Sequence, residues 1–176
     1  MVIRELERCE IPLVWTIDRR EVIANIYYLV EGKLVLKPEH YDMQGWPPGE
    51  SEIYTPILYD CFDRGGKFSG IFDGSQLIGV MLLESKFIGP EKNQLQLKLL
   101  HVSHSCRKTG LGSRLFKLAA DQAKALGAQK LYISATPSEN TVDFYLQRGC
   151  ILAGFVDQDL YALEPDDIHL EYSLLE

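Results

Sequence analysis

The sequence predicts a single domain of the mixed α/β class, with a mostly antiparallel central sheet flanked by helices. Three observations support this prediction. Segments in which apolar residues alternate with a period of two are interspersed with segments of helical period. Short glycine-containing turns connect three successive strand-like runs, which is typical of antiparallel pairing. A long amphipathic segment then separates two further runs, which is typical of a parallel pair.

The composition fits one globular domain. The chain has 176 residues, of which 46% are hydrophobic, and its formal net charge is −7. These values do not indicate a disordered or fibrous protein, and an acidic chain is a poor general binder of nucleic acid that mildly favours cationic small molecules. The first residues lack the apolar core of a signal peptide, and no apolar run approaches the roughly 20 residues that span a membrane. We therefore expect a cytoplasmic protein.

The four cysteines are scattered, at positions 9, 61, 106 and 150, without a C-x-x-C pair or the spacing of a zinc site. We expect reduced thiols and no metal. Cys106 lies in the glycine-containing loop described below, where it is either a nucleophile or, as we favour, a small residue that fills the loop.

The first 65 residues are β-rich and end in a helical segment. A short strand is expected at residues 2–6, and two β-rich runs within residues 22–36 meet at Glu31-Gly32, which favours a hairpin. Residues 37–49 contain three prolines and are expected to form a loop. Residues 50–64 carry a helical stripe that ends at Gly65-Gly66, but Pro56 predicts a kink or a later start.

Three strands are expected next, at residues 68–72, 77–84 and 94–102, with turns at Asp73-Gly74 and Gly89-Pro90. Residues 112–126 have one apolar and one charged face, which predicts a helix that Gly127 ends. The strand expected at residues 131–136 should then lie parallel to the strand before the helix.

The remaining chain predicts one more helix and two strands. Residues 136–139, Thr-Pro-Ser-Glu, have the form of a helix start with a capping box, and the helix is expected to reach Arg148 and be closed by Gly149. The two strands are expected at residues 150–155 and 168–172. We find no internal repeat, low-complexity tract or linker, so we expect one domain over residues 1–176.

Residues 100–113, Leu-His-Val-Ser-His-Ser-Cys-Arg-Lys-Thr-Gly-Leu-Gly-Ser, join a strand end, a basic turn and the start of the long helix. Unpaired backbone N–H groups and the positive end of the helix dipole suit a phosphate or pyrophosphate there. The dinucleotide fingerprint fails, because Leu115 stands where its third glycine is required. A Walker A loop fails as well, because no Gly-Lys-Ser/Thr follows Gly110 at the required spacing.

Arg107-x-x-Gly110-x-Gly112 resembles the Q/R-x-x-G-x-G/A signature of the Gcn5-related N-acetyltransferase (GNAT) superfamily. Residues 140–149, Asn-Thr-Val-Asp-Phe-Tyr-Leu-Gln-Arg-Gly, are similar to its second signature and follow after one helix and one strand, as in the superfamily. Cys150 departs from the pattern, which usually has an aromatic residue there. The resemblance covers about residues 66–149. Residues 149–156, together with the late strand of residues 166–172, loosely resemble streptothricin-type acetyltransferases.

The resemblance implies a single-domain GNAT fold that binds acetyl-CoA where a parallel strand pair splays apart. Residues 1–65 would form the acceptor side, residues 66–149 the acetyl-CoA-binding core, and residues 150–176 the C-terminal strands. The strand end would pair with the pantetheine arm like an added strand, and the loop amides would hold the pyrophosphate. The implied cofactor-binding residues are Leu100, His101, Val102, Arg107, Lys108, Thr109, Gly110, Leu111, Gly112, Ser113, Ser138 and Asn140.

Tyr145 is the residue that the resemblance implies as the general acid, which would protonate the departing CoA thiolate. The alternative is that Tyr145 is a core partner of Val142 and Leu146.

The sequence leaves open which residue, if any, is the catalytic base. Many relatives use a glutamate on the strand before the loop, where this chain has Gln94, Gln96 and Lys98. We name Glu84 as the base, with a solvated strand-end carboxylate as its alternative, and His101 as a substitute, with a packed or cofactor-facing histidine as its alternative. An amine that arrives neutral, or loses its proton through water, needs no protein base.

Aromatic and acidic residues of the first half either line a pocket for a cationic amine or anchor the core and loops; they are Tyr27, Tyr28, Glu39, His40, Tyr41, Asp42, Trp46, Glu50 and Tyr54. The function that we expect is acetyl transfer from acetyl-CoA to a primary amine of a small molecule by direct attack on the thioester. We expect a monomer or homodimer without nucleic-acid, membrane or metal partners. The alternative is a non-catalytic CoA-binding sensor or assembly module. Acetylation of proteins would require an open groove.

Overall fold

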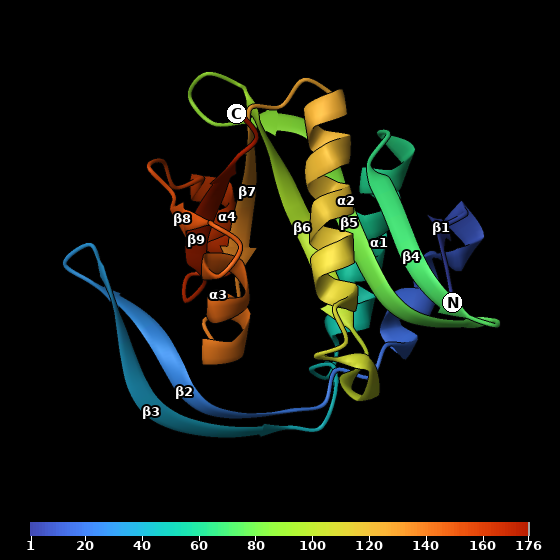
Figure 1. The fold of residues 1–176 in the computed structure, drawn as a ribbon, viewed down its shortest axis with the longest axis horizontal. Helices are drawn as coiled ribbons and strands as arrows, with labels where there is room; N and C mark the ends of the chain where they lie inside the picture. The colour runs from blue at the N-terminus through green and yellow to red at the C-terminus, as the bar shows by residue number, and fades with distance from the viewer. Residues whose placement is uncertain (176) are drawn as a thin grey trace. The chain divides into compact units, whose positions relative to one another are not determined.

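The mixed α/β class is confirmed by a computed structural model, which describes residues 1–175 (Figure 1). Within these residues, the main sheet runs in the order β1 (Val2–Glu5), β4 (Lys67–Asp73), β5 (Gln76–Ile88), β6 (Gln94–Val102), β7 (Lys130–Ala135), β9 (Ile168–Ser173) and β8 (Ile151–Leu152). The chain folds as two compact units. The first comprises Met1–Glu21, Met43–Ser85 and Leu97–Gln122; the second comprises Val22–Asp42, Lys86–Gln96 and the residues from Ala123 on.

Antiparallel strands form the sheet of the first unit. Strand β1 pairs with β4 from Val2↔Phe72 to Glu5↔Ser69, and β4 pairs with β5 from Lys67↔Leu83 to Asp73↔Gln76. The connecting turn contains Gly74 at φ 59°, a backbone conformation that glycine adopts without strain. The hairpin predicted at Asp73-Gly74 is therefore confirmed.

Helices cover this sheet with apolar side chains. The 3₁₀ helix η1 (Arg8–Thr16) occupies the stretch to which the sequence assigned no structure, and it buries Ile11 and Val14. Helix α1 (Glu50–Asp63) buries Leu58 and Cys61 in the same cluster. The expectation that Pro56 delays the helix is wrong, because α1 begins at Glu50 and continues through this residue.

Helix α2 (Leu111–Ala125) follows the glycine-containing loop. Its predicted apolar face is confirmed, because Leu115 and Ala119 are fully buried. A Cβ on Gly79 of β5 would lie 3.3 Å from Leu115 Cδ1, so the glycine leaves room for the helix.

In the second unit, the predicted parallel pair is confirmed. Strand β7 pairs with β6 from Gln94↔Lys130 to Gln96↔Tyr132, although β6 itself continues to Val102. Strand β9 lies antiparallel on the other side of β7, and β8 pairs with β9. Strand β8 has two residues instead of the six expected.

Helix α4 (Gln158–Leu163) was not expected from the sequence. Asp157 precedes it, and its carboxylate accepts hydrogen bonds from the backbone N–H groups of Asp159 and Leu160, both at 3.1 Å. This N-cap stabilises a helix too short to show an apolar period.

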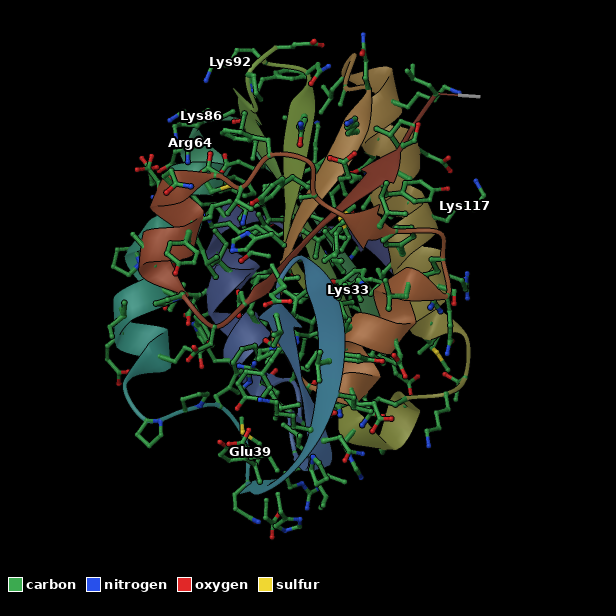
Figure 2. The ribbon with its side chains drawn as sticks, turned by 90° about the vertical axis from the view of Figure 1, so that its left-hand side faces the viewer. Lys33, Glu39, Arg64, Lys86, Lys92 and Lys117 are labelled. Carbon is green, nitrogen blue, oxygen red and sulfur yellow. The ribbon has the colours of Figure 1, made fainter. Side chains whose placement is uncertain are left out.

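Strands β2 (Glu21–Val30) and β3 (Lys33–Met43) form the predicted hairpin, whose turn residues Glu31 and Gly32 have φ of 49° and 75°. The loop expected from residue 37 is wrong over residues 37–43, because β3 continues through Pro38. Proline is tolerated where its missing N–H faces away from the ladder, as on an edge strand. Figure 2 labels Lys33 beside the turn and Glu39 further along β3.

Among the described residues, no helix is long and apolar enough to cross a membrane. Nor do residues 1–175 contain a group of three or more histidine, cysteine or acidic side chains placed to hold a metal ion.

Candidate functional site

The end of β6 and the loop after it lie in the first unit. The backbone N–H of Ser103 donates to the carbonyl of Ile78 at 2.8 Å, so β6 follows β5 as far as the loop. Leu100, His101 and Val102, which the resemblance implies as cofactor-binding residues, are all half-buried at this strand end.

Two residues of the loop adopt the left-handed backbone conformation before α2 begins. A short 3₁₀ turn, η2 (His104–Cys106), is followed by Lys108 at φ 62° and Gly110 at φ 86°. The N–H of Arg114 donates to the carbonyl of Gly110 at 3.1 Å, the first bond of the helix. The N–H groups in the first turn of a helix commonly bind anions. Leu111, Gly112 and Ser113, which the resemblance implies as cofactor-binding residues, occupy the first turn of α2.

Smaller contacts stabilise the loop. The hydroxyl of Thr109 donates to the carbonyl of Cys106 at 2.6 Å. Cys106 itself is a half-buried free thiol whose Sγ lies 3.7 Å from Ser105 Oγ. This hydroxyl is not the base that a nucleophilic thiol requires, so the geometry favours the loop-filling alternative.

The side chain of Arg107 turns back from the loop toward the strand end. Its Nε donates to the carbonyl of Val102 at 3.1 Å, and its Nη1 lies 3.4 Å from Glu21 Oε2. Part of its charge is therefore compensated by Glu21. Lys108, in contrast, is exposed.

A second segment of the first unit is tied to this loop. The N–H of His104 donates to the carbonyl of Asp18 at 2.8 Å, and the N–H of Asp18 donates to Ser103 Oγ at 3.1 Å. His104 Nδ1 lies 2.9 Å from the carbonyl of Arg20. The sequence carries no signal for these contacts, because they join residues far apart in the chain without a shared periodicity.

His101 packs among aromatic side chains. Its ring makes an edge contact with Trp46 at 5.0 Å between centroids, and Trp46 makes another with Trp15 at 4.9 Å. Burial, followed by the charges of Arg19 and Arg107, lowers the pKa of His101 to about 3. The imidazole is therefore neutral at physiological pH and a weak base, as a packed histidine would be.

Trp46 also makes a hydrogen bond and a cation–π contact. Its Nε1 donates to the carbonyl of Ile17 at 2.9 Å, and the guanidinium of Arg19 lies 4.8 Å from its ring centroid. Arg19 Nη1 also lies 3.3 Å from the carboxylate of Glu50. Two residues of the expected acceptor pocket, Trp46 and Glu50, thus share Arg19.

Glu84 is a buried carboxylate with several hydrogen-bond and ion-pair partners. Its carboxylate accepts hydrogen bonds from Arg64 Nη1 at 2.7 Å and from the N–H of Ser85 at 3.0 Å, and Lys98 Nζ lies at 3.7 Å. Burial would raise its pKa, but these donors and the two positive charges together lower it to about 2. The solvated-carboxylate alternative is wrong, because Glu84 is only 6% exposed.

Tyr145 lies in the second unit on helix α3 (Glu139–Leu146). It is 6% exposed and makes an edge contact with Phe144 at 5.1 Å between ring centroids. Burial, followed by the neighbouring Cys150, raises the pKa of Tyr145 above its ordinary range. The phenol is therefore protonated at physiological pH, which a proton donor requires.

The start of α3 differs from the expected capping box. Ser138 is the N-cap residue and is buried, but its hydroxyl donates to Thr141 Oγ1 at 2.9 Å, and no side-chain cap bond forms at Ser138 within the described chain. Asn140, in the first turn, is exposed.

Strand β2 holds α3 in the second unit. The N–H of Tyr27 donates to the carbonyl of Pro137 at 2.8 Å, and Ile26 bridges Ser138. The side chains of Tyr27 and Asn25 donate to Asp143 and Glu139, each at 2.7 Å. Residues two apart on a strand lie on the same face, and so do residues four apart on a helix. Asn25 and Tyr27 on the strand can therefore contact Glu139 and Asp143 on the helix at the same time. Tyr27, expected in the acceptor pocket, thus positions the helix that carries Tyr145.

Tyr28 and Tyr41, two other tyrosines of the expected pocket, both interact with the carboxylate of Glu39 in the β2–β3 hairpin. Tyr28 donates to Glu39 Oε2 at 2.6 Å, and this hydrogen bond, followed by burial, raises the pKa of Tyr28 to about 12. Lys37 Nζ lies 4.9 Å from the Tyr28 ring centroid, and the charge of Glu39 also raises the pKa of Tyr41. His40 and Asp42 are exposed on the same strand, whereas Tyr54 is half-buried in α1.

A family comparison matches most of this chain. Residues 35–150 match the acetyltransferase (GNAT) family. None of the curated protein sequences matches the chain significantly.

Solved structures resemble the chain over nearly its full length. Nourseothricin acetyltransferase has a TM-score of 0.72 at 15% identity, covering 99% of this chain and 98% of its own. A Bacillus anthracis protein described as a streptothricin acetyltransferase, in complex with acetyl coenzyme A, has a TM-score of 0.70 at 18% identity, covering 97% and 95%. An aminoglycoside 6'-N-acetyltransferase complexed with coenzyme A has a TM-score of 0.65 at 14% identity, covering 100% and 98%. Identities this low establish the fold alone.

Proposed function

Because the chain belongs to the acetyltransferase (GNAT) family, we propose that it transfers the acetyl group of acetyl-CoA to a primary amine of a small molecule. The observation that carries this proposal is the loop of residues 107–112. It bears the family signature, places Lys108 and Gly110 in left-handed conformations, and leads directly into the N-terminus of α2.

The donor set of the loop fits the pyrophosphate of the cofactor. A Cβ on Gly110 would meet no atom within 4 Å, so its positive φ, not crowding, is the structural requirement for glycine. We assign pyrophosphate binding to the amides of residues 108–113 and the ammonium of Lys108 and, from the resemblance, to the guanidinium of Arg107. From the resemblance we assign pantetheine pairing to the backbone of Leu100, His101 and Val102, and further cofactor contacts to Ser138 and Asn140.

Bound acetyl-CoA supplies a thioester carbonyl for the amine to attack and a thiolate that leaves. We assign Tyr145 as the donor of a proton to that thiolate sulfur. The second family signature, in which Tyr145 stands, supports the assignment. The phenol is protonated at physiological pH, as a proton donor must be.

We propose that no protein carboxylate removes the proton of the amine. Glu84 was the expected base, but its pKa of about 2 and its ion pairs with Arg64 and Lys98 make it a poor one. His101, with its pKa near 3, is similarly weak. An amine that arrives neutral, or that loses its proton through water, needs neither residue.

The acceptor that we propose is a small cationic amine, bound by residues of the first 65 positions. The net charge of −7 favours a cation. The names of the similar structures support a small molecule, because nourseothricin and aminoglycoside acetyltransferases are among them.

Release of free thiol from acetyl-CoA across a panel of amines tests the proposal. We expect release that depends on both enzyme and amine. The alternative, a CoA-binding sensor or assembly module, is favoured by the absence of a free glutamate on β6, where Gln94, Gln96 and Lys98 stand. Tight CoA binding without amine-dependent release from any acceptor would support that alternative.

A further inference from the structure

We propose that Glu21 competes with the pyrophosphate of the cofactor for the guanidinium of Arg107, and that this competition lowers the affinity for CoA and assists its release. The inference rests on the proposed function, because it assumes that the loop of residues 107–112 binds a pyrophosphate.

The geometry of Arg107 carries the inference. Its Nε donates to the carbonyl of Val102 and its Nη1 faces Glu21 Oε2 at 3.4 Å, so two of the three guanidinium nitrogens already face partners. A guanidinium pairs with a carboxylate and a phosphate through the same planar set of donors. The Glu21 carboxylate therefore occupies donors that a pyrophosphate would otherwise use.

The ion pair of Arg107 and Glu21 is partly buried, so its attraction is strong enough to affect ligand binding. The side chain of Arg107 is 29% exposed and that of Glu21 is 19% exposed, so solvent screens their attraction less than it screens a surface pair. The distance of 3.4 Å is longer than that of a strong charge-assisted hydrogen bond. An interaction of this strength can bias a binding equilibrium and still yield to a doubly charged ligand.

The backbone keeps Glu21 close to the loop. The preceding residues bind Ser103 and His104 through Asp18 and Arg20, as described above. Arg20, the nearest cation in sequence to Glu21, is itself paired with Asp18 at 2.6 Å. Little conformational entropy is therefore lost when Glu21 meets Arg107, and the pair re-forms readily when a ligand leaves.

The competition predicts a specific change in affinity. Replacing Glu21 by glutamine removes the competing charge and keeps the shape of the side chain. We expect Glu21→Gln to bind CoA about two- to fivefold more tightly, the range that an interaction of one partly exposed pair supports. We expect the gain mainly as slower CoA dissociation.

Calorimetric titration of CoA and of inorganic pyrophosphate into four proteins tests this: wild type, Glu21→Gln, Arg107→Gln and the double variant. Glu21→Gln should tighten both ligands in the wild-type background and change neither by more than about 1.5-fold when Arg107 is already glutamine. Asp18→Asn is the matched control, because it also removes one charge from the same segment and releases an arginine. It should change affinity less than Glu21→Gln does.

An equal gain in Asp18→Asn, or a gain of Glu21→Gln that persists without Arg107, would show a general charge effect and overturn the competition. Unchanged affinity in Glu21→Gln would overturn it as well. A wild-type chain that binds neither ligand would instead refute the proposed function. Thermal unfolding of each variant shows that the compared proteins are folded.

Discussion

At the scale of single residues, the pKa separates a catalytic carboxylate from a structural one. A general base works best with a pKa near the operating pH, whereas the pKa of Glu84 is lowered to about 2. Arg64, Lys98 and the N–H of Ser85 surround its two oxygens. The geometry therefore describes Glu84 as an ion-pair partner that joins β5 to α1 and β6.

Glu84→Gln should destabilise the protein without abolishing catalysis. The substitution removes the buried carboxylate that faces Arg64 and Lys98, although Arg64 keeps its exposed partner Asp60, and we expect a loss of about 2 kcal/mol in the free energy of unfolding. Urea denaturation measures the loss. Asp60→Asn is the control, because its carboxylate also pairs with Arg64 but is 67% exposed, and it should cost less than about 0.5 kcal/mol. A kcat reduced about 100-fold in a protein of unchanged stability would restore Glu84 as the base.

Tyr145→Phe tests the proton donor. The variant removes one hydroxyl from a buried ring, so the packing with Phe144 persists. We expect kcat to fall about 100-fold, the lower part of the range for general acid catalysis. The affinity for CoA, measured by calorimetry, should stay within about twofold of wild type, because the lost proton transfer acts only in the transition state.

Tyr161→Phe is the control for this variant, since Tyr161 is 48% exposed on α4. It should leave kcat unchanged. An unchanged kcat in Tyr145→Phe would favour the alternative in which Tyr145 is only a core partner of Val142 and Leu146.

At the scale of elements, the sequence predicts what is encoded locally. The turns at Glu31-Gly32 and Asp73-Gly74 were predicted because their conformations need glycine, and α2 because its apolar face repeats over four turns. Strand β3 was missed past residue 36, because Pro38 reads as a breaker until the edge position of the strand is known.

The candidate site also contains residues that sequence motifs predict and residues whose contacts the sequence does not predict. The loop of residues 107–112 and the helix bearing Tyr145 were predicted from two motifs of fixed spacing. The ion pairs of Glu84 and Arg107 could not be predicted, because each joins residues that are distant in the chain. Glu84 pairs with Arg64, and Arg107 pairs with Glu21. Spacing carries no information about such ion pairs.

The attachment of β2 to α3 is an element-scale feature that can be tested. Tyr27→Phe removes the hydrogen bond to the Asp143 carboxylate, a charge-assisted contact worth about 1–2 kcal/mol. We expect faster hydrogen exchange of the amides in α3 and of the Tyr27 amide, which donates to Pro137. Tyr28→Phe is the matched control, because its hydroxyl bonds to Glu39 within the hairpin. Equal exchange of α3 in both variants would contradict the role of Tyr27.

At the scale of the whole molecule, the titration of ion-paired and buried groups limits the pH range of stability. Three carboxylates, Glu10, Asp18 and Glu84, have pKa values lowered to about 2, in each case with an arginine as hydrogen-bond partner. An unfolded carboxylate titrates near pH 4. The stabilisation from these groups is thus present above about pH 4.5 and is lost as the pH falls toward 2.

The titration of His101 also lowers the stability of the folded protein as the pH falls, but it does so at a higher pH than the carboxylates. Its pKa is lowered to about 3 in the folded protein, so below about pH 6.5, where an unfolded histidine gains a proton, the unfolded state binds more protons than the folded one. Stability therefore begins to fall below pH 6.5. On the alkaline side, burial raises the pKa of Tyr132 to about 12 and raises the pKa of Tyr145 above its ordinary range. The stabilisation from these two groups is therefore lost only above pH 10.

These directions predict a plateau of thermal stability between about pH 7 and 9 with a decline on the acid side in two stages, first from His101 and then from the carboxylates. Melting temperatures measured from pH 3 to pH 10 test the profile. Glu84→Gln should lower the plateau and also flatten the slope between pH 5 and 3, because one of the protons taken up on unfolding is missing. A variant that is less stable but retains the wild-type slope would show that Glu84 contributes packing alone, and that its low pKa does not drive the acid transition.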